Sequence, residues 1–516
     1  MAERPLLFFP RPARSEVQGR KPGFEKIRYP SAQRQRERLA PQFSALEQIF
    51  AAKRAHLQNN PAGLSPEQTL VLETVGRVED FYKAVRGIHG LDWMGDFDVE
   101  DLAPDEEFYD QEDVEAVLHG RVYLVLYNQE GLGQLLSLWE TFQRNPDFPR
   151  FSSGRAKFKD LFLQLRALRP WGPEDRLRET GLLQDFQDRA AAGQEVMRVE
   201  VELWPRSKSW LRPRAESWIR TLVEREGGRV LGTCDIEAIA YHAVLTELPI
   251  QSVQRILADT SVELVQCEQV MFLRPAGQVL AEPPDGEPED TSVPVRNLGL
   301  PAGEPVAALL DGLPLANHEL LADRLIIDDP DRWEDQYPAS VRHHGTAMAS
   351  LILHSELDAP AEPLSRPLYV RPVMKPDPQH QGREIIPPDC LTVDLIHRAV
   401  RRILEGEGSE PPAASSVKII NLSLGDPTRL FDRYPSPWAR LLDDLAARYN
   451  VLFVVSAGNH PDKIDLAVPI RIQRSAGRSR ADAGRDPAGD PQRESPAAAP
   501  CARRSDQCSH DRSPAL

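Results

Sequence analysis

The sequence predicts an α/β protein. We expect an incomplete, doubly wound parallel sheet in residues 306–470, preceded by an α+β module and by a mainly helical N-terminal region. Three short apolar runs separated by amphipathic helical stretches are typical of buried parallel strands; they are Val306–Leu310, Val417–Leu422 and Val451–Val455. Upstream of them, Met197–Leu203 alternates apolar and polar side chains, which indicates a strand with one buried face.

Composition restricts the class of protein. The chain has 516 residues, enough for several domains, and a net charge of −16 that disfavours a general nucleic-acid binder. Its 5 cysteines show no metal-ligand spacing, which favours a reducing compartment. No apolar stretch approaches the ~18 residues of a membrane span, and Leu6–Phe9 is too short for a signal sequence. We therefore expect a cytoplasmic protein with no nucleic-acid and no membrane partner.

Residues 1–118 are expected to be helical or irregular. Apolar side chains at helical spacing predict helices over 36–58 and 78–88. The acidic run 96–115 is interpreted as a solvated loop. Its aspartates Asp96, Asp98 and Asp101 lack the glycine and glutamate of an EF-hand, so a metal site there is disfavoured.

Residues 119–195 are predicted to form an α/β segment, with a strand over 122–127 and helices over 129–143 and 157–168. Nothing in this segment suggests chemistry.

Residues 196–275 show the order strand, helix, strand, strand, helix, strand. The predicted bounds are 197–204, 214–226, 229–234, 238–245, 250–257 and 262–273. This order is that of the ferredoxin-like unit, a fold that hosts so many functions that a purely structural domain is an equal alternative. The acidic, Pro-rich stretch 276–305 that follows is interpreted as a linker.

Polar residues stand at the ends of the predicted parallel strands or at a helix start. Asp311 follows the first apolar run, Asn459 follows the third, and His344 precedes a Gly-Thr corner that opens a helix. Because the carboxyl ends of parallel strands meet at one edge of a sheet, these groups are expected to converge. A histidine at such a corner is a candidate general base, although it can also simply pack at a helix start. His318 and His343 compete for the role, and His344 is preferred because it directly precedes Gly-Thr.

The motifs jointly resemble the subtilisin (S8) family of serine peptidases. They are Asp311-Gly312, His344-Gly345-Thr346, Asn421-Leu422-Ser423-Leu424-Gly425 and Ser456-Ala457-Gly458-Asn459, all between about residues 300 and 470. The resemblance implies that His344 is the general base, Asp311 orients its ring, and Asn459 stabilises the oxyanion. It also implies that Ser423, Leu424 and Gly425 line a polypeptide substrate with backbone hydrogen bonds. No cofactor is expected; calcium is open by family, with no residue pattern to support it.

The family's nucleophile segment, Gly-Thr-Ser-x-Ala-x-Pro, is not found after Asn459. Residues 471–516 instead form an Arg-rich tail with too few apolar side chains to fold, either a disordered tail or, as we prefer, the result of a frame change. The first hypothesis is therefore a truncated serine endopeptidase that is inactive in this chain. The alternative is a pseudoprotease that binds polypeptide or a partner protein.

Two further hypotheses concern regulation. In subtilisin-like enzymes a ferredoxin-like propeptide often precedes the catalytic domain as folding chaperone and temporary inhibitor, which is a role open to residues 196–275. A partner ATPase that presents substrates is a speculation from the long N-terminal region.

Overall fold

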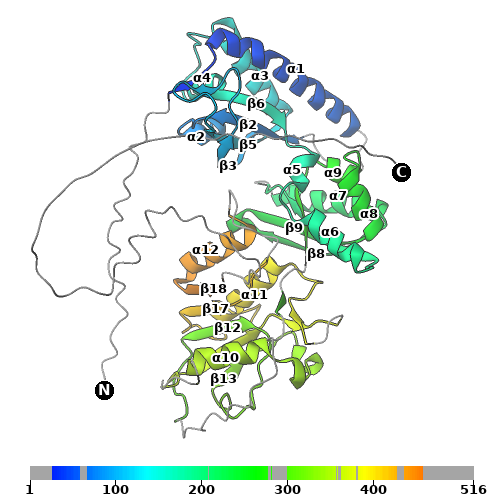
Figure 1. Cartoon of the computed structure of the whole chain (residues 1–516), viewed down its shortest axis with the longest axis vertical. Helices are drawn as coiled ribbons and strands as arrows, with labels where there is room; N and C mark the ends of the chain where they lie inside the picture. The colour runs from blue at the N-terminus through cyan, green and yellow to red at the C-terminus, as the bar shows by residue number, and fades with distance from the viewer. Residues whose placement is uncertain are drawn as a thin grey trace, which may run out of the picture. The chain divides into compact units, whose positions relative to one another are not determined.

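The computed structural model describes residues 26–57, 67–206, 209–276, 280–281, 299–355, 357, 362–378, 382–426 and 435–456. Within these residues lie three larger sheets, each covered by helices, and two small ones (Figure 1). None of the described helices is long and apolar enough to cross a membrane.

The first sheet takes two strands from residues 1–118, which we predicted to be helical or irregular, and two from the segment around 119–195 that we predicted to be α/β. Its four antiparallel strands follow the order β3-β5-β2-β6, and they are β2 (Glu67–Val75), β3 (Leu91–Leu102), β5 (Leu118–Asn128) and β6 (Leu165–Pro170). Four helices accompany them: α1 (Ala32–Leu57), α2 (Phe81–Arg86), α3 (Gln129–Arg144) and α4 (Lys157–Gln164). A two-stranded ladder joins β1 (Ile27–Arg28) to β4 (Tyr109–Asp110).

Three of our predictions in this region are wrong. The boundary at 118/119 divides one sheet, because β5 begins at Leu118 and pairs with both β2 and β3. Strand β3 enters the acidic run that we interpreted as a loop, and there the Arg121 guanidinium of β5 binds both Asp96 and Asp98. The helix predicted over 157–168 ends at Gln164, since the next residues pair with β2 as strand β6.

The second sheet is formed by residues 196–275, in the order β10-β7-β9-β8 with antiparallel neighbours throughout. Its strands are β7 (Val196–Leu203), β8 (Arg229–Ile236), β9 (Tyr241–Pro249) and β10 (Val270–Pro275). Helix α7 (Arg212–Arg225) connects β7 to β8, and α8 (Ile250–Ala258) with α9 (Glu263–Gln266) connects β9 to β10. Residues 263–266 are thus helical, where we predicted the start of a strand.

Both antiparallel sheets have the same strand order when their strands are numbered along the chain, namely second, third, first, fourth. They are joined through α5 (Pro173–Leu177) and α6 (Leu182–Ala191), and through a contact in which the Trp171 indole nitrogen donates to the carbonyl of Met271 over 3.0 Å. Trp171 also meets the Trp204 ring edge-on. The N-terminal part of the chain and the middle module therefore share a buried cluster.

The third sheet is parallel, in the order β13-β14-β12-β17-β18. Its strands are β12 (Ala307–Asp311), β13 (Leu325–Ile327), β14 (Leu368–Pro372), β17 (Ile419–Leu422) and β18 (Leu452–Val455). A small antiparallel sheet stands beside it, in the order β11-β16-β15, from Leu280–Ala281, Glu384–Ile385 and Lys375–Pro376.

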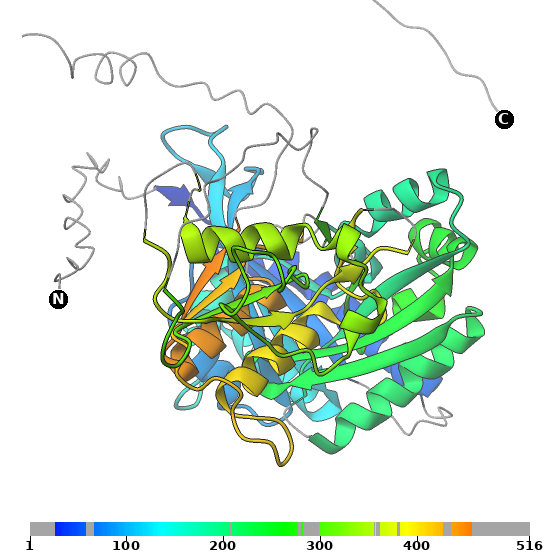
Figure 2. The same cartoon turned by 90° about the horizontal axis from the view of Figure 1, so that it is seen from below.

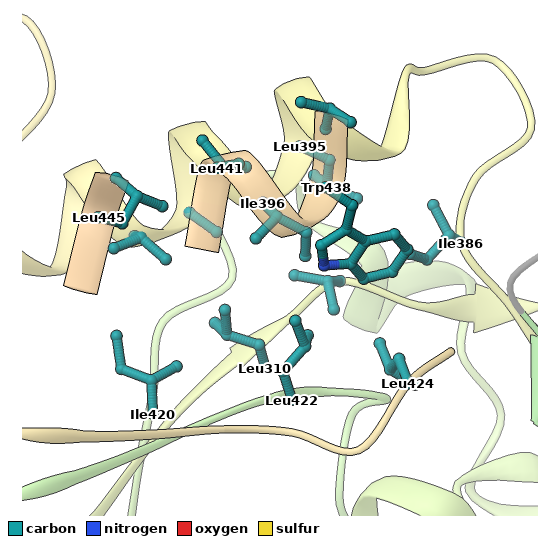
Figure 3. Close-up of a cluster of buried hydrophobic side chains, with 14 of the residues drawn as sticks. Leu310, Ile386, Leu395, Ile396, Ile420, Leu422, Leu424, Trp438, Leu441 and Leu445 are labelled. Carbon is teal, nitrogen blue, oxygen red and sulfur yellow. The ribbon is translucent and has the colours of Figure 1, made fainter. Parts of the chain in front are cut away.

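Helices cover both faces of the parallel sheet. On one face, α10 (His344–His354) buries Ala349 and Leu353 against Leu309 and Val370. On the other, α11 (Thr392–Leu404) and α12 (Pro437–Tyr449) pack in one cluster with β12 and β17 (Figure 3). Because neighbouring residues of a strand point to opposite faces, Leu309 and Leu310 serve the two cores separately.

The middle module shares a core with α11 and α12. The alternating face of β7 that we predicted to be buried, Met197, Val199, Val201 and Leu203, packs with α7 and α8. The strands of the middle module are the long green arrows of Figure 2. Residues of β8 and β9 on the opposite face belong to the cluster around α11 and α12; they include Ile236, Tyr241, Ala243 and Leu245. The acidic side chains Glu200 and Glu202 are buried as well. The charge of Glu202 is paired, because its carboxylate lies 3.1 Å from Arg274 and 3.6 Å from Arg440 of α12. The module is thus held to the parallel-sheet domain by both apolar and charged contacts.

Candidate active site

Asp311 ends strand β12, and its carboxylate is fully buried. Its Oδ1 accepts the backbone N–H of Gly312 over 2.6 Å, while Oδ2 has no hydrogen-bond partner among the residues that the structure describes. Burial raises the pKa of this carboxyl above its ordinary value, and the hydrogen bond from His344 acts in the opposite direction. A carboxylate at this depth is stabilised by its donors, and its strongest donor is the neighbouring histidine.

His344 is the first residue of α10, and its Nδ1 lies 2.6 Å from Asp311 Oδ1. The hydrogen bond to Asp311 raises the pKa of the His344 imidazole above 6.5. With Nδ1 held by the carboxylate, Nε2 is left as the basic edge of the neutral ring. The side chain remains 26% exposed, so the ring is not sealed off from solvent. This is the geometry of a general base with its orienting carboxylate.

Two glycines let the strand end and the helix start approach each other. A Cβ on Gly345 would lie 2.1 Å from the carbonyl oxygen of Gly312, so only glycine fits there without a shift of backbone. The Thr346 hydroxyl donates to the carbonyl of Arg342 and accepts the N–H of Leu315 over 2.9 Å. Thr346 thus ties the loop after Asp311 to the start of α10.

Glu384 is a site residue that the sequence analysis missed. It lies on β16, is 1% exposed, and accepts the backbone N–H of His344 over 2.8 Å through Oε2. Its Oε1 accepts the hydroxyl of the buried Tyr337. Burial raises the pKa of the Glu384 carboxyl, opposed by these donors.

Gly312 is the sequence signal that points to Glu384. A Cβ at position 312 would lie 2.0 Å from Glu384 Oε1 and 2.7 Å from the Tyr337 hydroxyl. A larger residue beside Asp311 is therefore excluded because the Glu384 carboxylate occupies that space.

Ser423, Leu424 and Gly425 follow β17 at the same edge of the sheet as Asp311, since β12 and β17 are parallel neighbours. Leu424 is buried in the core, Gly425 is exposed, and the Ser423 hydroxyl lies 3.0 Å from Asn421 Oδ1. Asn459 lies outside the described residues.

The other histidines are not brought to Asp311. His343 is exposed, and His318 is exposed with its Nδ1 accepting the backbone N–H of Leu320 over 3.3 Å. In the part of the chain that the structure describes, no group of three or more His, Cys, Asp or Glu side chains is arranged to hold a metal ion.

The chain that leaves the middle module returns beside this site. After β10, Leu280–Ala281 forms β11 and pairs antiparallel with β16, with Ala281 opposite Glu384. The other edge of β16 is taken by β15. Both edges of the strand that carries Glu384 are therefore occupied by this chain.

An Asp-His pair therefore lies at the carboxyl edge of a helix-covered parallel sheet, the edge at which such sheets place their ligand sites. Residues 304–484 match the family model of the subtilase family, peptidase S8. This part of the chain is therefore a subtilisin-like S8 peptidase domain.

The remaining comparisons add little. None of the curated proteins matches the chain. Among solved structures, one described as an unknown protein from Galdieria sulphuraria is similar over 38% of this chain and 93% of its own, at 11% identity and a TM-score of 0.11. A similarity at that score carries no argument about fold or function.

Proposed function

We propose that the S8 domain uses His344 as general base and Asp311 as its orienting carboxylate in serine-type peptide hydrolysis. The observation that supports this role is the 2.6 Å contact between Nδ1 and the buried carboxylate, which fixes the ring of a side chain that is 26% exposed. In that role His344 takes the proton of an attacking serine hydroxyl and returns it to the leaving amine. Asp311 stabilises the imidazolium that forms in between.

A polypeptide substrate would lie along Ser423–Gly425 and accept backbone hydrogen bonds from it, as extended peptides do at an open edge. Asn459 is assigned the oxyanion role from its place in the sequence, four residues after β18 ends at Val455. The middle module is interpreted as ferredoxin-like and propeptide-like. Its contacts with α11 and α12, together with the pairing of β11 and β16, support an inhibitory and fold-assisting role.

A second candidate is a polypeptide-binding domain without cleavage. The observation that favours it is the lack of a Gly-Thr-Ser segment after Asn459, which leaves no evident nucleophile for His344 to activate. A peptidase by family that is inactive in this chain stays our first candidate, and the polypeptide binder is its alternative. An ATPase partner would fit either state, and co-purification of the full chain with its cellular partners tests that proposal.

One pair of measurements on the full chain separates the two candidates. A fluorophosphonate probe reacts only with an activated serine, so labelling that disappears in His344→Ala would establish the peptidase and overturn the binder. We expect no labelling, and binding of fluorescein-labelled, carboxymethylated casein instead. Binding should weaken in Gly425→Pro, which removes a backbone N–H, and persist in Gly425→Ala, which keeps it. Equal binding by both variants would exclude Ser423–Gly425 as the polypeptide edge.

A further inference from the structure

Glu384 has an unusual set of contacts for a carboxylate outside the Asp-His pair. One oxygen accepts the backbone N–H of His344 over 2.8 Å, and the other accepts the Tyr337 hydroxyl. The side chain is 1% exposed, so no solvent competes for either oxygen. A buried carboxylate is costly unless its oxygens are satisfied, which makes both contacts strong constraints on geometry.

The N–H group that Glu384 accepts lies at a special position in the backbone. His344 is the first residue of α10, where backbone N–H groups lack helical partners and the helix dipole favours a negative charge. No side chain at the helix start itself caps α10. The Glu384 carboxylate, coming from β16, therefore satisfies the backbone of the catalytic residue itself.

Tyr337 and Arg342 hold Glu384 from the loop before the helix. The Arg342 Nε donates to the Tyr337 carbonyl over 2.9 Å, and its guanidinium lies 5.8 Å from the Tyr337 ring centre. On the opposite side, Gly312 leaves the space that the carboxylate fills. The groups that face Glu384 are thus Tyr337, the backbone of Gly312 and His344, with the charges of Asp311 and His344 close enough to act on it.

We infer that Glu384 is a positioning residue: by binding the backbone N–H of His344 and the Tyr337 hydroxyl, it fixes the start of α10 and thereby the distance from His344 to Asp311. This inference rests on the proposed role of His344. It also links the pairing of β11 with β16 to the position of His344, because Ala281 of β11 stands opposite Glu384 in the ladder.

The test is NMR of the full chain labelled with ¹⁵N-histidine. It reads three signals of His344: its titration, its backbone amide exchange, and the low-field proton expected of an Nδ1–H bound to a carboxylate. Comparison with His344→Ala assigns these signals among the 12 histidines. None of the readouts requires a nucleophile.

Glu384→Gln removes the charge and places an NH₂ group against one of two donors, so one contact is lost. We expect the titration midpoint of His344 to fall, its amide to exchange about tenfold faster, and the low-field proton to broaden. Glu384→Asp keeps the charge but is one methylene shorter and cannot reach both partners. It should speed amide exchange with a smaller change in the titration, and it carries the test if Glu384→Gln does not fold.

The matched control is Asp328→Asn, at a second tyrosine–carboxylate pair in the same domain, whose carboxylate is half-buried. Asp328 accepts the Tyr369 hydroxyl and binds Arg402 over 2.7 Å. We expect Asp328→Asn to leave the three His344 signals unchanged. Unchanged signals in both Glu384 variants, or equal changes in Asp328→Asn, would overturn the inference. A wild-type chain without the low-field proton would instead refute the Asp311–His344 pair, and with it the proposed function.

Discussion

Gly345→Ala should separate Asp311 from His344 without touching either side chain. The new Cβ would lie 2.1 Å from the Gly312 carbonyl oxygen, against about 3.4 Å for an ordinary contact, so the helix start must retreat by roughly 1.3 Å. Gly345 follows His344 and Gly312 follows Asp311. A retreat of that size would stretch the 2.6 Å contact between His344 and Asp311 to about 3.9 Å, beyond hydrogen-bond length.

The cost in stability follows from the same geometry. Overpacking costs about 1–3 kcal/mol, and loss of a hydrogen bond to a charged group about 1.5–3 kcal/mol. The better helix propensity of alanine returns about 1 kcal/mol. We expect a net loss of about 1.5–5 kcal/mol in the free energy of unfolding, measured by denaturant titration, together with loss of the low-field His344 proton.

The control is Ala347→Gly, an exposed position in the same helix. It lowers helix propensity by about 1 kcal/mol without pressing on the strand, and the low-field proton should survive. If Gly345→Ala kept both the stability and the low-field proton, the close contact between Gly345 and Gly312 would not be what fixes the distance from His344 to Asp311.

Three further predictions follow from the contacts described. Asp311→Asn should lower the His344 titration midpoint toward 6.5, because the hydrogen-bonded carboxylate is what raises it. Below its midpoint the imidazole is protonated and cannot act as a base, so His344 of the variant should stay neutral to lower pH. An unshifted midpoint by NMR would contradict the pairing. Trp438→Ala should cost about 3–5 kcal/mol in denaturant unfolding because the indole is buried in the cluster of α11 and α12, whereas Trp210→Ala, at an indole 57% exposed, should change stability by less than about 0.5 kcal/mol. Residues 196–276 expressed alone should show mixed helix and strand by circular dichroism and bind a separate fragment 299–456, because the module's face of Ile236 and Tyr241 is left uncovered; a random-coil spectrum would refute independent folding.

The parallel sheet was the most predictable part of the fold. Residues 306–310 and 451–455 are continuous apolar runs, and 417–422 is apolar except for Lys418 and Asn421; each appears within a residue or two as β12, β18 and β17. The N-terminal sheet was missed because its strands carry mixed signals. The acidic side chains of β3 predict a solvated loop, because their pairing with Arg121 on β5, a strand distant in sequence, cannot be read from local sequence.

The candidate site was predictable to the extent that it follows local motifs. Asp311 and His344 each stand at a strand end or helix start, and the structure brings them together. Glu384 belongs to no motif and comes from a short strand 40 residues after His344. The burial of Glu200 and Glu202 was equally hidden, because polar residues alternating along a strand predict a solvated face, and only contact with another domain reverses that.

The shared core of the middle module and helices α11 and α12 has a consequence for synthesis on the ribosome. The module is finished at Pro275, but the parallel sheet that α11 and α12 cover is not complete until β18 ends at Val455. At about 5–20 residues per second, the intervening chain takes roughly 9–36 s to emerge. During that interval the finished module presents Ile236, Tyr241 and Leu245 to solvent. Translation speed across residues 276–455 should therefore influence the yield of folded protein, and synonymous codons that slow this stretch would lengthen the time in which nascent chains can aggregate.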